Sequence, residues 1–181
     1  MSQTWFPRTL LWDLDGTLAF WKNLWIVPGV ARLYLRERPA DVSSFRVLMA
    51  AAKTFRETLQ NSGPQSNDSR FVQWMSHRLR RPSLEIRMMT ERFLHSPELT
   101  ALVNEYIRPI PEALELLRAL IPSGKWRHLV ATNPVMPSAF NRLRLNLAGF
   151  SPDWFEYIAG SEDFCGQKRK ARFYEDFLRF H

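Results

Sequence analysis

The sequence predicts an α/β fold in which an all-helical insertion interrupts a parallel sheet. Two apolar runs with strand character, 9–14 and 126–131, each lead into polar residues. Between Thr17 and Ile107, apolar residues recur at helical spacing, and no strand pattern of convincing length is present. Strands separated by helices are typical of a parallel sheet, and a long helical run between them is typical of an inserted bundle.

The composition is that of a globular chain with one domain, or one domain with an insertion. It has 181 residues, of which 45% are hydrophobic and 24% charged. The longest unbroken apolar run, Val47 to Ala52, is far shorter than a membrane span, so we expect no membrane partner. Cys165 is the only cysteine, which rules out an internal disulfide and favours a cytoplasmic protein.

The positive charge is concentrated in the middle of the chain. The net charge is +7, and residues 22–108 hold 14 Lys/Arg against 8 Asp/Glu, a net of +6. Nucleic-acid binding is an alternative that such charge leaves open, but no nucleic-acid motif accompanies it. A small phosphorylated metabolite would be attracted by the same field, and we expect this kind of partner.

The first strand carries the strongest chemical signal. It reads Leu10-Leu11-Trp12-Asp13-Leu14-Asp15-Gly16-Thr17-Leu18. In a strand, the period of two places Asp13 and Asp15 on one side at the carboxyl end, where ligands bind in open α/β sheets. Adjacent carboxylates repel, so they need a cation or a shared proton. Gly16 permits a tight turn, and Thr17 can bond a phosphate oxygen. An acidic turn or a calcium-binding loop is the alternative interpretation.

The insertion is predicted to contain four or five helices. Pro28 suits the first turn of the first one, and Asp41, Ser43 or Ser44 can cap the second. The first two predicted helices cover 29–35 and 45–59, and the last covers 97–107. Between them, one helix is predicted to start at Asp68 or Ser69 and reach Leu79, and another to start at Pro82 or Ser83 and reach Leu94. Residues 61–67 have the composition of a loop. We expect the aromatic and methionine residues of these helices to form a packing core.

Alternating helices and strands return after Pro109. The range 111–120 predicts a helix with an acidic first turn, and Trp126 to Ala131 predicts a strand that leads into Thr132 and Asn133. The rest of the chain predicts a helix over 139–148, a short strand over 155–159 and a helix over 173–180. A hydroxyl and an amide at the end of a strand can hold a phosphate oxygen.

Residues 10–18 resemble the first motif of the haloacid dehalogenase (HAD) superfamily of phosphohydrolases. The strand that ends at Thr132 is similar to the second motif of the family. The resemblance implies a Rossmann-like three-layer core formed by 1–20 and 109–181, with 21–108 as an all-helical cap.

The third motif of the family is a lysine before an aromatic-rich helix. Its spacing from Phe173-Tyr174 identifies Lys168 as the match, with Lys170 as the alternative, because Arg169 stands where the family usually has proline. A solvated basic run before a helix is the plainer interpretation of this stretch.

The resemblance implies Mg²⁺-dependent phosphomonoester hydrolysis. Asp13 would attack phosphorus and become an aspartyl-phosphate, while Asp15 would act as acid and then as base. Asp13 and Asp15 would also be the metal ligands. The implied phosphate-binding residues are Thr17, Thr132, Asn133 and Lys168. The identity of the phosphorylated substrate cannot be inferred from these motifs.

The fourth motif of the family, an acidic pair on a further strand, has no counterpart in this sequence. Glu162-Asp163 precedes Lys168 and so lies on the wrong strand for that role. We therefore expect a sheet that is incomplete on its C-terminal side, a weakened metal site, and a strand 9–14 with an uncovered edge open to self-association. A truncated enzyme and a catalytically inactive interaction or scaffold protein are the alternatives.

Overall fold

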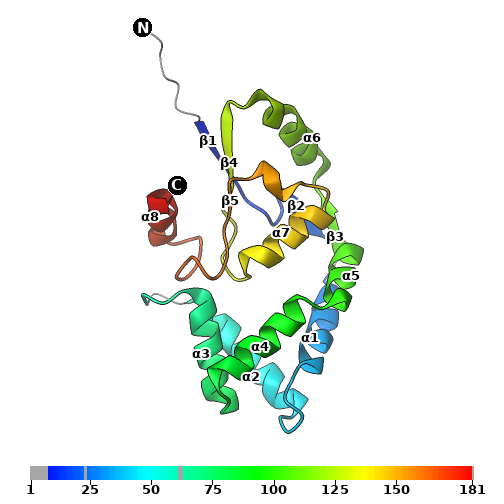
Figure 1. The fold of residues 1–181 in the computed structure, drawn as a ribbon, viewed down its shortest axis with the longest axis vertical. Helices are drawn as coiled ribbons and strands as arrows, with labels where there is room; N and C mark the ends of the chain where they lie inside the picture. The colour runs from blue at the N-terminus through cyan, green and yellow to red at the C-terminus, as the bar shows by residue number, and fades with distance from the viewer. Residues whose placement is uncertain (1–7, 23, 61–62, 181) are drawn as a thin grey trace.

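The computed structural model describes residues 8–22, 24–60 and 63–180, and its centre is a three-stranded parallel sheet (Figure 1). The strands are β1 (Arg8–Trp12), β4 (Trp126–Val130) and β5 (Tyr157–Ile158), in the order β1-β4-β5. Leu11 is in register with Leu129, and Val130 with Ile158. The predicted α/β class with a parallel sheet is confirmed. Residues 1–7 of the predicted core lie outside the described residues.

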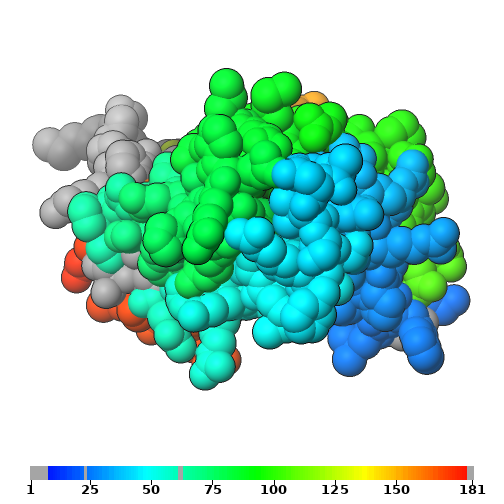
Figure 2. Space-filling model, turned by 90° about the horizontal axis from the view of Figure 1, so that it is seen from below, coloured from blue at the N-terminus to red at the C-terminus, as the bar shows by residue number. Residues whose placement is uncertain are grey.

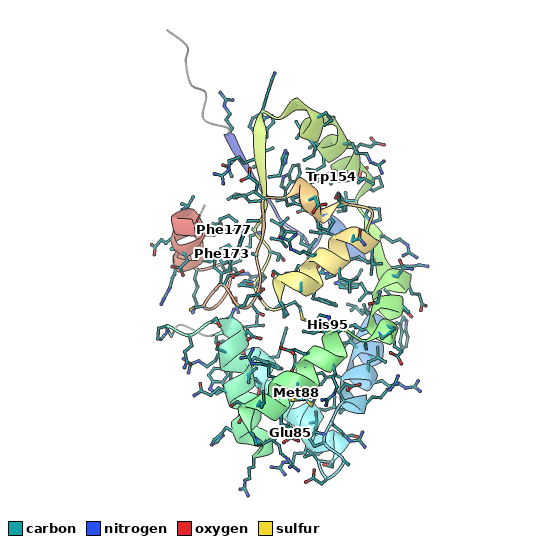
Figure 3. The ribbon with its side chains drawn as sticks, viewed as in Figure 1. Glu85, Met88, His95, Trp154, Phe173 and Phe177 are labelled. Atoms are coloured by element: carbon teal, nitrogen blue, oxygen red, sulfur yellow. The ribbon has the colours of Figure 1, made fainter. Side chains whose placement is uncertain are left out.

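Helices cover both faces of this sheet and make three layers. They are α6 (Pro111–Leu120), α7 (Ser138–Leu147) and α8 (Ala171–Phe180). The 3₁₀ turn η1 (Ile121–Ser123) lies between α6 and β4, and η2 (Pro152–Trp154) lies between α7 and β5. Val130 packs into the cluster that contains residues of α6 and α7, whereas Leu129 packs with Phe173 and Phe177 of α8. Figure 3 shows these two phenylalanines on the side of α8 that faces the sheet. Neighbouring strand residues thus supply opposite faces.

Five consecutive helices lie between β2 and β3 and form the lower part of the molecule in Figure 1. They are α1 (Ile26–Arg36), α2 (Ser44–Leu59), α3 (Asn67–Leu79), α4 (Ser83–Leu94) and α5 (Pro97–Tyr106). We call them the helical segment. Viewed from below in Figure 2, they form most of the visible surface. No helix in the described ranges combines the length and apolar character needed to cross a membrane.

A short antiparallel pair joins the helical segment to the rest of the chain. It consists of β2 (Ala19–Trp21) and β3 (Ile107–Pro109), and Phe20 pairs with Arg108. The sequence did not predict either strand, because three residues are too few to show a period of two. Ile107, predicted as the end of a helix, is instead the first residue of β3.

Serine caps decide where three of these helices begin. The side chains of Ser43, Ser66 and Ser96 accept hydrogen bonds from the backbone N–H groups three residues later. Such caps contribute about 1 kcal/mol each. The cap at Ser66 starts α3 at Asn67, earlier than predicted, so the predicted loop over 61–67 is one residue too long at this end. Its positions 61 and 62 lie outside the described residues.

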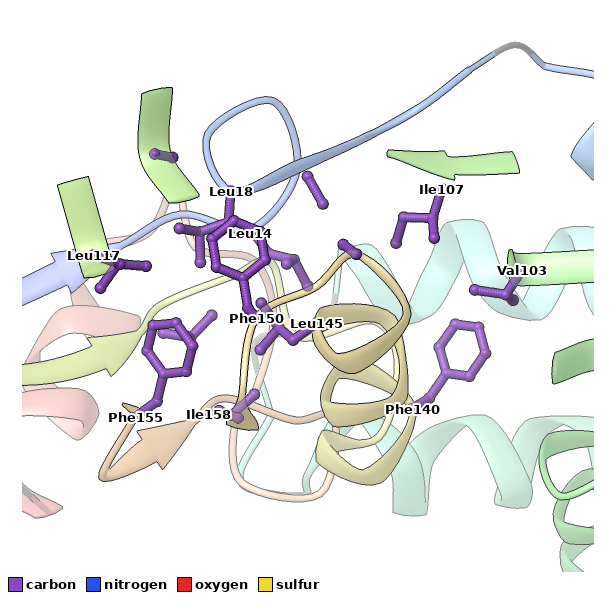
Figure 4. Close-up of a cluster of buried hydrophobic side chains, with 14 of the residues drawn as sticks. Leu14, Leu18, Val103, Ile107, Leu117, Phe140, Leu145, Phe150, Phe155 and Ile158 are labelled. Atoms are coloured by element: carbon purple, nitrogen blue, oxygen red, sulfur yellow. The ribbon is translucent and has the colours of Figure 1, made fainter. Parts of the chain in front are cut away.

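Besides the cluster under α8, the buried apolar side chains form two clusters, and the larger one spans both parts of the chain because it includes Phe93, Leu99 and Val103 of the helical segment. Figure 4 shows the larger one, in which Leu14 and Leu18 from the segment after β1 meet Leu145 of α7 and Phe150. A second cluster lies within the helical segment and includes Val47, Met75, Leu79, Ile86 and Met89. The helical segment therefore has an apolar core of its own.

β1 lies at an edge of the described sheet, as the sequence led us to expect. Leu11 is 46% exposed, although its register partner Leu129 on β4 is buried. The two side chains differ in exposure because the aromatic residues of α8 pack on Leu129 and Ala131 of the β4 region, whereas Leu11 does not belong to that cluster.

Candidate active site

β1 ends at Trp12, so Asp13 is the first residue beyond the strand. The backbone N–H of Ala131 donates to the Trp12 carbonyl at 2.8 Å. Pairing with β4 therefore continues to the positions just before Asp13 and Thr132, which follow the ends of two neighbouring parallel strands. The predicted strand was two residues too long, because apolar Leu14 extends the pattern while its side chain is buried in the core beyond the sheet.

A tight turn, and not the pleat of a strand, determines where Asp15 lies. The Leu14 carbonyl accepts hydrogen bonds from the N–H groups of Leu18 and Ala19 at 3.1 and 3.0 Å. Gly16 has φ of +82°, a conformation that glycine adopts without strain, and its N–H donates to the Ala19 carbonyl at 2.9 Å. The period-of-two argument for Asp13 and Asp15 is thus wrong, because neither residue belongs to β1.

Lys168 contacts Asp13 directly. Its Nζ lies 2.9 Å from Asp13 Oδ1, and its backbone N–H donates to Asn133 Oδ1 at 3.2 Å. Three residues that are far apart in sequence therefore meet where β1 and β4 end. Lys170 is exposed, and its carbonyl accepts the N–H of Phe173 at 3.0 Å, so this geometry favours Lys168 over Lys170.

Asp15 forms an ion pair with Arg144, a residue that the sequence analysis missed. The Arg144 side chain is only 6% exposed, and its guanidinium lies 4.8 Å from the centre of the Trp21 ring. Its Nη1 also donates to Asn141 Oδ1 at 3.3 Å. The sequence did contain a signal for this ion pair. Arg144 lies one helical turn after Phe140 on the buried face of α7, where a charged side chain needs a partner.

The two predicted threonines have different surroundings. Thr132 is buried at the end of β4, whereas Thr17 is exposed in the turn after Asp15. The structure therefore brings together Asp13, Asn133 and Lys168 and pairs Asp15 with Arg144, while Thr17 faces solvent.

Asn67 fastens the helical segment to the loops that carry these residues. Its Nδ2 donates to the carbonyls of Pro134 and Gly166, both at 2.8 Å, and its Oδ1 accepts the Gly166 N–H at 2.7 Å. Pro134 follows Asn133, and Gly166 lies two residues before Lys168. Asn67 is completely buried. It was also missed, because it falls in a stretch that the composition predicts to be a loop.

The acids near the site offer few ligands for a metal ion. Within the described ranges, no group of three or more His, Cys, Asp or Glu side chains could hold one. Asp13 and Asp15 each use Oδ1 in an ion pair. Mg²⁺ commonly takes only one or two carboxylates and completes its octahedron with water and substrate phosphate. Asp13 and Asp15 would thus supply the number of carboxylates that a Mg²⁺ site commonly uses, and its further ligands would have to come from water and the substrate.

Glu162 and Asp163 are engaged elsewhere. Glu162 Oε1 accepts hydrogen bonds from the Ser138 N–H at 2.9 Å and its hydroxyl at 2.5 Å. Asp163 Oδ2 accepts from the Tyr157 hydroxyl at 2.6 Å. These carboxylates organise the loop after β5.

No protein-family model matches the sequence, and no curated protein is similar enough to match it. Solved structures do match. YfnB from Bacillus subtilis, assigned as a HAD-hydrolase and bound to magnesium in its crystal structure, is 17% identical with a TM-score of 0.53, and the match covers 95% of this chain and 73% of that one. A hydrolase from Pseudomonas syringae is 13% identical with a TM-score of 0.51, over 96% of this chain and 70% of that one.

The chain therefore has a HAD-like fold. The L-2-haloacid dehalogenase of Xanthobacter autotrophicus also matches, at 14% identity and a TM-score of 0.44, over 96% of this chain and 64% of its own. The two matches with TM-scores above 0.5 confirm the sequence resemblance to HAD proteins for the fold. The roles of Asp13, Asp15, Thr17, Thr132, Asn133 and Lys168 stay predictions, because likeness at this level of identity concerns architecture alone.

Proposed function

We propose that this HAD-like protein hydrolyses phosphomonoesters through an aspartyl-phosphate on Asp13. The observation that carries the proposal is the contact between Lys168 Nζ and Asp13 Oδ1 at 2.9 Å, made by residues from opposite ends of the chain. A carboxylate beside a cation at the carboxyl end of a parallel sheet suits phosphoryl transfer, because the cation can also bind the oxygens of the transferring group. Asp13 keeps 40% of its side chain exposed, so a substrate can reach it.

The reaction needs two carboxylates with different tasks. An Asp13 oxygen forms a bond to phosphorus while the bond from phosphorus to the alcohol oxygen breaks, and Asp15 gives that oxygen a proton. Water then attacks phosphorus, Asp15 takes its proton, and the bond to Asp13 breaks. Arg144 pairs with Asp15, and half of the Asp15 side chain remains exposed.

Mg²⁺ belongs to this proposal as the cofactor, held by Asp13 and Asp15. When bound, it would reduce the repulsion between the substrate phosphate and the carboxylates. Thr132 and Asn133 would bind phosphate oxygens together with Lys168, and Thr17 would do so after a change in the turn that carries it.

The division into a core of 1–20 and 109–181 and a cap of 21–108 is part of the same proposal. Support comes from the separate apolar cluster of the helical segment and from the Asn67 hydrogen bonds to the loops of the site. A cap fastened at this position can exclude water from the reacting phosphate.

The test is hydrolysis of p-nitrophenyl phosphate with and without Mg²⁺. We expect Mg²⁺-dependent turnover that falls by at least about a thousandfold in Asp13→Asn, because the amide is no nucleophile. Asp153→Asn, an exposed acid in η2, is the matched control and should keep full activity. Turnover that survives in Asp13→Asn, or is absent from the unmodified protein, contradicts the proposal.

A catalytically inactive interaction protein is the second candidate. The exposed Leu11 on the edge strand favours it, because an apolar strand with unpaired backbone groups can pair with another chain. This function predicts no Mg²⁺ binding by calorimetry and a dimer in sedimentation that Leu11→Lys dissociates. A monomer with Mg²⁺-dependent turnover would exclude it.

A further inference from the structure

A large cavity lies between the helical segment and the loops of the site. Its volume is about 540 Å³, within the range of small-molecule binding pockets. The wall is mainly apolar and aromatic, with Trp21, Phe55, Phe71, Phe93, Met136 and Phe140 among its residues. Leu48 and Phe55 line it and are 39% and 40% exposed, so large apolar side chains face open space here.

Three residues of the cavity lining carry hydroxyl groups that are buried and turned away from the open space of the cavity. They are Tyr34, Thr58 and Thr90. Burial raises the pKa of Tyr34 to about 12, and the neighbouring Thr90 hydroxyl offsets only part of this effect. Because these polar groups are withdrawn, the surface that a bound molecule meets in the cavity is almost entirely apolar.

The cavity is linked to the proposed reaction centre by Trp21 and by the loop after β4. One wall is the Trp21 ring, which also contacts the Arg144 guanidinium that pairs with Asp15. A second wall is formed by Val135 and Met136, which follow Asn133 on the loop after β4. The groups proposed to cleave the ester do not line the cavity themselves, and one tryptophan and one short stretch of loop connect the two places.

From these observations we infer that the cavity binds the alcohol part of the substrate, and that this alcohol is large and apolar. The inference rests on the proposed function and adds the substrate class to it. The substrates would be phosphate monoesters of long-chain or branched apolar alcohols. A polar sugar or polyol would leave most of its hydroxyl groups unpaired against this wall. An apolar chain needs no such partners.

The experiment compares octyl phosphate with ethyl phosphate. Both have a primary alkoxide as leaving group, so the chemistry is matched and the difference reports burial of the chain. Each buried methylene raises kcat/KM by roughly fourfold, so burial of four of them gives a ratio on the order of 100 in favour of octyl phosphate. A ratio near one, with both esters hydrolysed, overturns the inference and leaves the proposed function standing.

Ala52→Phe fills the cavity from α2, where Ala52 is an exposed residue of the lining. We expect it to lower the ratio at least tenfold and to leave kcat/KM for ethyl phosphate within about twofold. Ala101→Phe, at an exposed position of α5 outside the cavity, is the control and should leave both values unchanged. An equal effect of both variants would contradict the assignment of the cavity.

Calorimetry with 1-octanol separates the two proposals if neither ester is hydrolysed. Octanol binding that Ala52→Phe abolishes and Ala101→Phe retains would support the apolar site, and only the hydrolytic function would fail. Absence of octanol binding to the unmodified protein would overturn the inference about the cavity itself.

Discussion

Two neighbouring carboxylates in this chain are each paired with a different cation. Asp13 contacts Lys168 from the loop before α8, and Asp15 contacts Arg144 from α7. The pairs differ in burial, because Arg144 is almost fully enclosed and is held by Trp21 and Asn141. Within the proposed mechanism, Arg144 is therefore a positioning residue that fixes the carboxylate of Asp15.

Arg144→Met tests this role. We expect kcat to fall by about 10- to 100-fold with little change in KM, since Asp15 loses its orientation but the phosphate contacts remain. Arg142→Met, an exposed residue of the same helix, is the control. An unchanged kcat together with a lower melting temperature would mean that Arg144 is only structural.

His128 makes stability depend on pH. Burial lowers the pKa of His128 below its ordinary value of 6.5, and its Nδ1 accepts the Trp12 Nε1–H at 3.0 Å. The unfolded chain therefore binds this proton at higher pH than the folded chain does. The stabilisation from the neutral histidine is complete above pH 6.5 and declines as the pH falls below that value.

Denaturant titrations between pH 7.5 and 5 measure the effect. We expect the free energy of unfolding to decrease across this range and His128→Gln, which is less stable overall, to show a smaller decrease. His77→Gln removes an exposed histidine and should keep the slope of the unmodified protein. If His128→Gln keeps the full slope, other groups are responsible for the pH dependence.

At the scale of elements, the side chain of Asn67 makes three of the hydrogen bonds that connect α3 to the loops of the site, and the backbone of α3 adds others. Asn67 makes three hydrogen bonds to Pro134 and Gly166, and its backbone N–H donates to the Phe164 carbonyl at 2.9 Å. Asn67→Ala would leave buried backbone groups of both loops unpaired. We expect a loss of about 1–3 kcal/mol in the free energy of unfolding.

The same substitution should lower turnover, because Asn133 and Lys168 are carried by the two loops that it releases. Asn104→Ala, at an exposed position of α5, is the control for both measurements. Full activity of Asn67→Ala at a temperature where it stays folded would show that the site does not need this connection.

Elements with long patterns were predictable, and contacts between distant residues were not. The helix over 111–120 and the strand that leads to Thr132 follow from spacing and turn residues alone. β2 and β3 could not be predicted, because each depends on its partner for pairing. The spacing from Phe173-Tyr174 already favoured Lys168 over Lys170, whereas its contact with Asp13 and the partnership of Arg144 with Asp15 required the three-dimensional arrangement, since no local pattern encodes these contacts.

For the molecule as a whole, the excess positive charge lies in the helical segment, and ion pairs within that segment leave its net charge unchanged. Residues 22–108 carry a net charge of +6. Five of their eight acids form ion pairs with arginines of the same segment. The folded protein therefore presents a positive field on the side of the site where the proposed cap lies, and this field should attract a dianionic phosphate ester from a distance.

Salt dependence of turnover measures this attraction. Salt screens exposed charges beyond about 10 Å at 0.1 M, so raising the ionic strength should lower kcat/KM for ethyl phosphate by roughly threefold to tenfold and leave kcat nearly constant. Arg56→Glu, an exposed change on α2, should reduce the salt effect, whereas Arg118→Glu on α6 of the core should alter it less. If kcat/KM is insensitive to salt while short duplex DNA binds tightly and in a salt-dependent manner, the charge of the helical segment serves nucleic-acid binding instead, since neutralised phosphates release counterions there.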